Sequence, residues 1–299
     1  HYLADGFGYG KHQMRSRYNS LQAMNSGGYD TYQKPSSNGI PWMYESNIPG
    51  IALVRVGTHR ETEDIKKFER TVALISTDIK HPYIIDLFYM KGQGMPGKAK
   101  RREYFFHSAK NHQQISTVSL PMKKLPGERG MLTLEGQKWS AKMLNAKGYG
   151  IFFDAHEGDA SANFTVDFEV SDPWKPLMWN FDPKRSKVKT EIKGKTPNSA
   201  LPFKAKDDSY ADKPAIGLRR HIVGSPGMKA YKYNMPHPQK LHGNQHSNGW
   251  GRMPGFLLRH DVKDTSQGTE FLVVHEAWQK KPYIRSVKRL PKENGSENA

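Results

Sequence analysis

The chain has 299 residues, with 46 Lys or Arg against 29 Asp or Glu, so its formal net charge is +17. It contains no cysteine, which excludes disulfide scaffolds, thiol catalysis and Cys-ligated zinc or iron–sulfur sites. No apolar run approaches the roughly 18 to 20 residues that a membrane-spanning helix needs, and aromatic residues make up 11% of the chain. The composition predicts a folded protein that does not span a membrane.

The excess of positive charge favours an anionic partner: a nucleic acid, an acidic polysaccharide or a membrane surface. A basic surface that only keeps the protein in solution is the alternative, and charge alone does not decide between them. The sequence begins at His1 without a charged n-region or an apolar h-region. We therefore expect that a signal peptide is absent or removed, or that the chain is an internal piece of a longer protein.

The strongest hydrophobic periodicity is two. Between Phe164 and Val170 apolar residues alternate with polar ones, as in a half-buried strand. Residues 65–75 have helical spacing, but their β-branched residues favour a strand. Other β-rich runs with Gly or Pro turn signals between them, such as Ser225-Pro226-Gly227, are residues 51–56, 83–90, 103–107, 151–154, 256–262, 271–275 and 284–287. This pattern predicts an all-β protein, a large antiparallel β-sandwich with long loops.

Two segments depart from the strand pattern. Residues 182–215 are rich in lysine and poor in large apolar residues, which predicts a basic insertion or long hairpin. For this segment, a solvated insertion is favoured over a region that binds a polyanion. Asp154, His156, Glu157 and Asp159 form an acidic group that we interpret as a turn with solvated carboxylates rather than a cation site.

The first 35 residues carry the densest chemistry. Tyr9, Arg15, Arg17, Tyr18 and Asn25 lie close together with few aliphatic residues between them. Tyr and Arg in this proportion suit a site that neutralises an acid and moves a proton. Tyr-rich segments also cap sheets and line ordinary interfaces, and the residues alone leave the two readings even.

Several segments, in chain order, resemble the C-terminal β-sandwich of the heparinase II/III-like polysaccharide lyases. Leu3-Ala4-Asp5-Gly6-Phe7-Gly8-Tyr9-Gly10 resembles the family's L-x-D-x-G-Y-G stretch, and Met24-Asn25 stands at its His-Asn pair. Further similar segments are Arg70 to Ile75, Pro82 to Phe88 with Lys91-Gly92, Tyr104-Phe105-Phe106-His107, Gly255 to Arg259, and Phe271 to Glu276. The resemblance covers nearly the whole chain apart from the basic insertion.

This resemblance implies a single β-sandwich domain of the supersandwich type over residues 1–299. The α/α-toroid domain that precedes it in the family is absent from the chain, so it is either a separate chain or a missing part of the same polypeptide. Relatives bind a zinc ion through an Asp matching Asp5 and the His that Met24 replaces here. Because a thioether is a poor Zn²⁺ ligand, the divalent metal site is incomplete.

The resemblance also implies β-elimination on an anionic uronate polysaccharide. Asn25 is carried over by motif, and residue type adds Arg15 and Arg17 to face the substrate carboxylate. Tyr9 or Tyr18 would transfer the proton, and His107 would bind substrate. Without the toroid, we expect little or no activity from this chain alone.

Two other functions remain open. The chain could be a non-catalytic β-sandwich that binds polyanions or carbohydrate, in which case Tyr9 and Tyr18 are dispensable. Nucleic-acid binding ranks last, because the aromatics alternate with aliphatics as core residues do. The substrate of a lyase leads us to expect a periplasmic or extracellular location.

Overall fold

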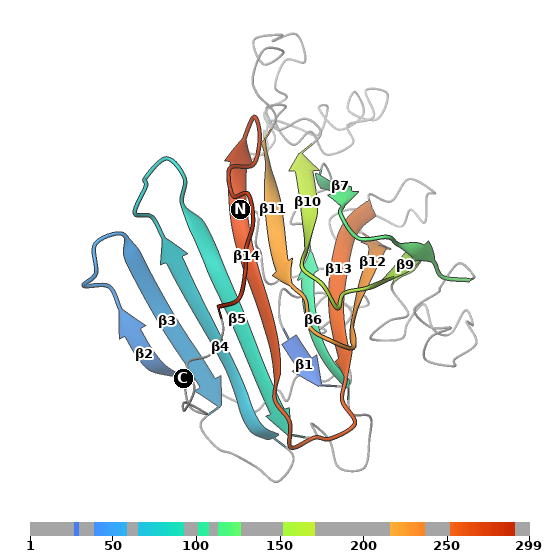
Figure 1. The fold of residues 1–299 in the computed structure, drawn as a ribbon, viewed down its shortest axis with the longest axis horizontal. Helices are drawn as coiled ribbons and strands as arrows, with labels where there is room; N and C mark the ends of the chain where they lie inside the picture. The colour runs from blue at the N-terminus through green and yellow to red at the C-terminus, as the bar shows by residue number, and fades with distance from the viewer. Residues whose placement is uncertain are drawn as a thin grey trace, which may run out of the picture.

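The computed structural model describes residues 27–29, 39–58, 65–92, 101–107, 113–126, 152–170, 216–236 and 252–290. Every regular element in these ranges is a β-strand, and every strand pair is antiparallel (Figure 1). None of the described residues forms a helix of the length and apolar character that a bilayer span requires. The all-β prediction is confirmed.

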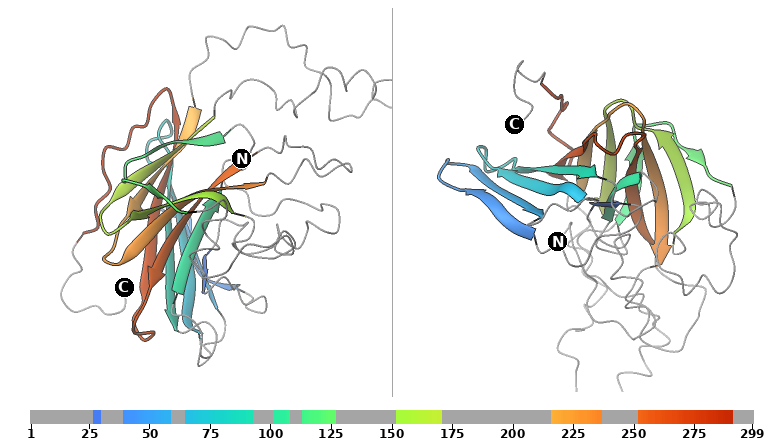
Figure 2. Two further views of the ribbon diagram at one scale, coloured as in Figure 1. Left: turned by 90° about the vertical axis from the view of Figure 1, so that its right-hand side faces the viewer. Right: turned by 90° about the horizontal axis from the view of Figure 1, so that it is seen from below.

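The strands form two sheets that face each other (Figure 2). Sheet A has the order β1 (Gly27–Tyr29), β6 (Arg101–His107), β13 (Arg252–Asp261), β12 (Met228–Pro236), β9 (Phe153–Asp159) and β8 (Lys123–Lys124). Sheet B has the order β2 (Gly39–Glu45), β3 (Ile51–Thr58), β4 (Ile65–Ile75), β5 (Tyr83–Gly92), β14 (Thr269–Gln279), β11 (Ile216–Val223), β10 (Phe164–Val170) and β7 (Gln113–Val118).

The predicted strands are found with one exception. The expected strand at residues 284–287 is wrong, because residues 282–290 form no strand. This segment is held against sheet B by side chains instead: Glu276 accepts the backbone N–H groups of Tyr283 and Ile284, and Asn163 donates to the Val287 carbonyl (2.9 Å). The basic segment 182–215 lies outside the described residues.

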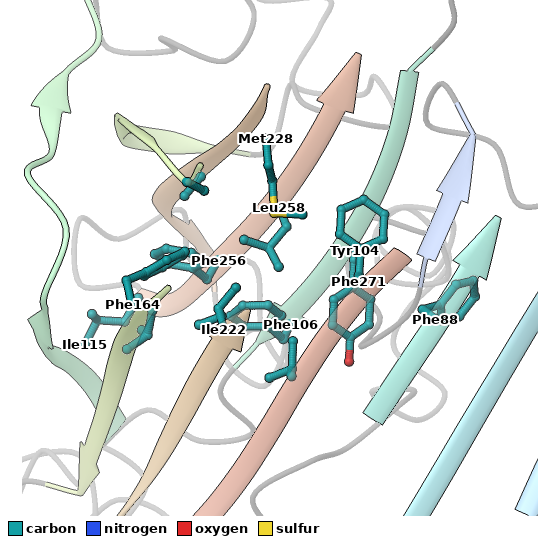
Figure 3. Packing of buried hydrophobic residues seen from close by; sticks show 14 of the residues in the cluster. Phe88, Tyr104, Phe106, Ile115, Phe164, Ile222, Met228, Phe256, Leu258 and Phe271 are labelled. Carbon is teal, nitrogen blue, oxygen red and sulfur yellow. The ribbon is translucent and has the colours of Figure 1, made fainter. Parts of the chain in front are cut away.

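The hydrophobic core lies between the inner faces of the two sheets (Figure 3). Along each strand every second side chain points inward, as the alternation in the sequence predicts. Phe106 and Phe256 of sheet A stack with their ring centroids 5.3 Å apart, and Phe164 of sheet B lies 6.0 Å from Phe256. Burying these rings removes a large apolar area from water, so this layer is the main stabilising contribution.

The turn between β11 and β12 follows the predicted chemistry. Ser225, Pro226 and Gly227 connect the strands, Gly227 has φ +80°, and the N–H of Met228 donates to the Ser225 carbonyl (3.0 Å). Glycine adopts a positive φ without the steric penalty of a Cβ. The turn sets the register of β12, the strand that carries Tyr231 and Tyr233.

Sheet B is wider than sheet A. Strands β2 and β3 extend to one side, past the edge of sheet A formed by β1 and β6 (Figures 1 and 2). Large apolar side chains on this side of sheet B are exposed, among them Tyr44 of β2 at 72% and Leu74 of β4 at 42%.

The core assignment predicts a contrast between two apolar truncations. Phe256→Ala removes a ring that is 0% exposed and should lower the free energy of unfolding by about 3–5 kcal/mol. Leu290→Ala, at a side chain that is 81% exposed, should change it by less than about 0.5 kcal/mol. Urea denaturation followed by circular dichroism measures both, and equal losses would contradict the assigned core.

Candidate functional site

Strand β6 sends side chains to both faces of sheet A. Tyr104 and Phe106 point into the core, so Glu103, Phe105 and His107 point to the outer face. The two faces carry different groups of polar residues. We call them the inter-sheet cluster (Arg70, Asp86, Tyr104, Arg220 and His275) and the sheet A face (Glu103, His107, Tyr231, Tyr233 and Arg259).

The inter-sheet cluster centres on Asp86. Its two carboxylate oxygens accept hydrogen bonds from Arg70 Nε (3.0 Å) and a terminal Arg70 nitrogen (2.7 Å), a bidentate pair between neighbouring strands of sheet B. Tyr104 of sheet A donates its hydroxyl to the same carboxylate (2.5 Å). One side chain thus joins the two sheets through the core.

Two further basic side chains surround this carboxylate. His275 Nε2 lies 3.6 Å from Asp86 Oδ2, beyond direct hydrogen-bond length. Arg220 is fully buried, with its guanidinium 4.1 Å from the Phe168 ring centroid and 4.7 Å from that of Phe106. Two aromatic faces therefore stabilise the buried cation.

Charge and burial compete in this cluster. Burial opposes the ionisation of Asp86, but His275 and Arg70 beside it outweigh that cost and lower the pKa of the carboxyl. Burial lowers the pKa of Arg220 to about 9, so the guanidinium stays charged at neutral pH. The cluster is a structural link, because its carboxylate is already occupied by Arg70 and Tyr104.

The sheet A face contains two polar pairs side by side. The Tyr233 hydroxyl and His107 Nε2 lie 3.1 Å apart, and both side chains are 1% exposed. Arg259 forms an ion pair with Glu103 (2.7 Å), and its guanidinium lies 5.1 Å from the Tyr231 ring centroid. A phenol, an imidazole, a guanidinium and a carboxylate thus share the outer face of three adjacent strands.

Burial keeps the Tyr233–His107 pair uncharged. Burial, with repulsion from Arg220, lowers the pKa of His107 to about 3. Burial, with the charge of Glu103 nearby, raises the pKa of Tyr233 well above its ordinary value of 10. At neutral pH the hydrogen bond therefore joins a phenol and a neutral imidazole. The geometry of the pair is fixed by Phe152, which stacks on Tyr233 with ring centroids 3.8 Å apart.

Of the predicted site residues, the structure describes His107. Asp5, Tyr9, Arg15, Arg17, Tyr18 and Asn25 lie outside the described residues. Strand β1 begins two residues after Asn25 and pairs with β6, Gly27 opposite Tyr104. The segment with the predicted site residues therefore leads directly into the strand beside the one that carries His107. Contact between His107 and substrate stays a prediction.

The predicted divalent metal has no support from the described ranges. Asp5 and Met24 lie outside them, and within them no three His, Asp or Glu side chains converge where an ion could bind. The acidic group at 154–159 is part of β9, so the predicted turn there is wrong. Its carboxylates pair with lysines instead, Asp154 with Lys124 (3.2 Å) and Glu157 with Lys229 (3.0 Å).

Sequence reasoning did not single out Tyr231, Tyr233, Glu103 or Arg259. A signal was present: Tyr231 and Tyr233 stand two positions apart. Period two places two tyrosines on one face of a strand. The sequence does not show that β12 pairs with β13, so it does not predict that Arg259 lies beside these tyrosines.

No protein-family model matches the chain, and no curated protein matches it. Among solved structures, the chain is similar to a mutant heparan sulfate lyase from Pedobacter heparinus (TM-score 0.45, 7% identity, 93% of this chain and 28% of that one). It is also similar to a heparinase III with methylated lysines (TM-score 0.45, 7% identity, 96% of this chain and 30% of that one). The chain spans less than a third of either protein.

The inter-sheet cluster predicts a large difference between a buried and an exposed ion pair. Asp86→Asn leaves Arg70 without its carboxylate and the buried Arg220 without a nearby negative charge, and should cost about 3–5 kcal/mol of unfolding free energy. Glu270→Gln breaks an ion pair with Arg289 whose side chains are 28% and 42% exposed, and should cost less than about 1 kcal/mol. Equal losses in urea denaturation would refute the cluster as the link between the sheets.

The lowered pKa of His107 predicts a pH dependence of stability. An unfolded histidine binds a proton near pH 6.5, whereas folded His107 does so only near pH 3. As pH falls from about 6.5 to 3, the unfolded state therefore takes up a proton that the folded state does not, and the unfolding free energy decreases. His107→Gln should flatten this dependence by up to one proton. Denaturation at pH 7, 6, 5 and 4.5 measures the slopes, and unchanged slopes would exclude a buried neutral His107.

Proposed function

We propose that this chain is the β-sandwich portion of a polysaccharide lyase that cleaves uronic-acid-containing polysaccharide by β-elimination. One observation carries the proposal: Arg70, Asp86, Tyr104 and His275 come from four separate segments that resemble the heparinase II/III-like lyases, and they meet in the inter-sheet cluster. A chance likeness in four short segments gives no reason for their polar residues to converge. The meeting supports the resemblance as one of whole folds.

The proposed reaction removes the proton at C5 of a uronate. The electron pair of the C5–H bond forms the C4–C5 double bond, the C4–O glycosidic bond breaks, and the leaving oxygen takes up a proton. Arg15, Arg17 and Asn25 would neutralise the substrate carboxylate, which stabilises the negative charge that develops next to C5. Tyr9 or Tyr18 would act in the proton transfers.

We assign the sheet A face to the support of this chemistry, because its side chains are at most 3% exposed. One of its strands, β6, pairs with β1. Strand β1 follows directly on the segment that holds Asn25. The Tyr233–His107 pair there is neutral, and Arg259 beside it is paired with Glu103. A helical toroid packed beside β1, where the N-terminal segment enters sheet A, would complete the substrate groove, and we expect export to the periplasm or cell exterior because the substrate is a polymer.

An activity assay separates the lyase from the non-catalytic alternative. The chain alone, incubated with a uronate polysaccharide, should produce little of the ultraviolet absorbance of the unsaturated product. The chain together with its helical toroid should produce it readily. In that complex, Tyr9→Phe or Tyr18→Phe should lower kcat by about 100-fold or more, whichever tyrosine transfers the proton. Tyr44→Phe, at an exposed tyrosine of sheet B, is the matched control and should leave kcat unchanged.

The outcomes are distinct. Retention of polysaccharide without any product from the complex would favour a non-catalytic binding module. Full activity in both tyrosine variants would remove Tyr9 and Tyr18 from the mechanism. Rapid turnover by the chain alone would show that no toroid is needed.

A further inference from the structure

Strand β2 exposes three consecutive large side chains at the free side of sheet B. Trp42, Met43 and Tyr44 are 58%, 50% and 72% exposed. Single exposed apolar residues are ordinary, but a contiguous run on one strand marks an interaction surface or an aggregation hazard. These residues belong to the part of sheet B that extends past sheet A (Figure 2).

A β-bulge turns Trp42 toward the outer face of sheet B. The register with β3 shifts between Pro41 and Met43, so Trp42 is the extra residue. Its indole lies over Gly57, where a Cβ would come within 2.5 Å of the indole Nε1 and 3.1 Å of Glu69 Cγ. A glycine at this point lets the ring rest on the sheet. Tyr44 pairs with Val54 and faces the opposite side.

Charged side chains of both signs lie on the same outer face as this tryptophan. Arg55, 41% exposed, is bonded to Glu69 (2.5 Å) beside the indole. Lys67 follows on the same face of β4, two residues or about 7 Å from Glu69. Lys91 of β5 is its direct cross-strand partner. Two cationic side chains in register thus lie on the same face as the exposed indole, two residues along β4 from the Glu69 that the indole approaches.

We propose that Trp42, Lys67 and Lys91 form a binding subsite for a pyranuronate chain on the outer face of sheet B. A pyranose ring has an apolar C–H face that stacks on an indole, and the carboxylate of a neighbouring sugar meets the lysines. The two lysines favour a glycan over a protein as the occupant, because lysine is depleted in the centres of protein interfaces. The subsite binds without cleaving and faces away from sheet A, so it goes beyond the proposed lyase function and does not depend on it.

Binding of an unsulfated oligogalacturonate to the full chain tests the proposal. In two-dimensional NMR of the ¹⁵N-labelled protein, the indole N–H signal of Trp42, identified by its loss in Trp42→Phe, should shift on titration. Trp42→Ala should weaken binding at least 10-fold, whereas Tyr44→Ala, on the other face of the same strand, should change it less than twofold. Lys67→Gln with Lys91→Gln should weaken binding and reduce its salt dependence. A neutral glucan of equal length should bind the unaltered chain more weakly.

Gly57→Ala provides an independent variant, because its methyl group displaces the indole without removing it, and it too should weaken binding. Thermal unfolding checks that each variant is folded. Equal binding by Trp42→Ala and Tyr44→Ala, or no shift of the indole signal, would overturn the subsite. Self-association that Trp42→Ala abolishes, with saccharide binding unchanged, would identify a second copy of the chain as the occupant. Because no turnover is measured, a failed subsite leaves the lyase proposal standing, and an inactive lyase leaves the subsite standing.

Discussion

The hydrogen bond from Tyr104 to Asp86 is the constraint on which the arrangement of sheet A depends. It joins β6 to β5 through the core and fixes which β6 residues point inward. Side chains alternate strictly along a strand, so a shift of one residue would exchange the two faces. With Tyr104 held inward, Phe106 meets the core aromatics and His107 is directed to the opposite side, toward Tyr233.

Much of the fold follows from the sequence because apolar alternation is a local signal. The run from Phe164 to Val170 and the β-branched residues of 65–75 are such cases, and both form strands. Strand β11 was not predicted, since Arg219, Arg220 and His221 look polar in sequence. Each is neutralised or stacked only by distant residues: Arg219 by Asp167, Arg220 by Phe106 and Phe168, and His221 by Glu276. Local pattern contains no trace of such partners.

The candidate site shows the same limit. His107 was singled out by its motif, but the Tyr233 that it contacts is 126 residues away in the chain and depends on the order of strands in the sheet. The motif residues Asp86 and His275 lie in the buried inter-sheet cluster. In the structure they support the core of the sandwich, so a likeness in sequence identified the architecture through its buried polar links rather than through its chemistry.

The order of strands in sheet B has a consequence for biosynthesis. Strand β14 lies between β5 and β11, although it is the last strand of the sheet in the chain. Before residue 279 leaves the ribosome, β2 to β5 and β11 with its neighbours are two unjoined ribbons with open edges at their centre. Pairing between such distant segments is slow, and open edges invite association between nascent chains. Strand β14 therefore completes sheet B by pairing with both ribbons. A chaperone that shields the two ribbons during translation would favour productive assembly.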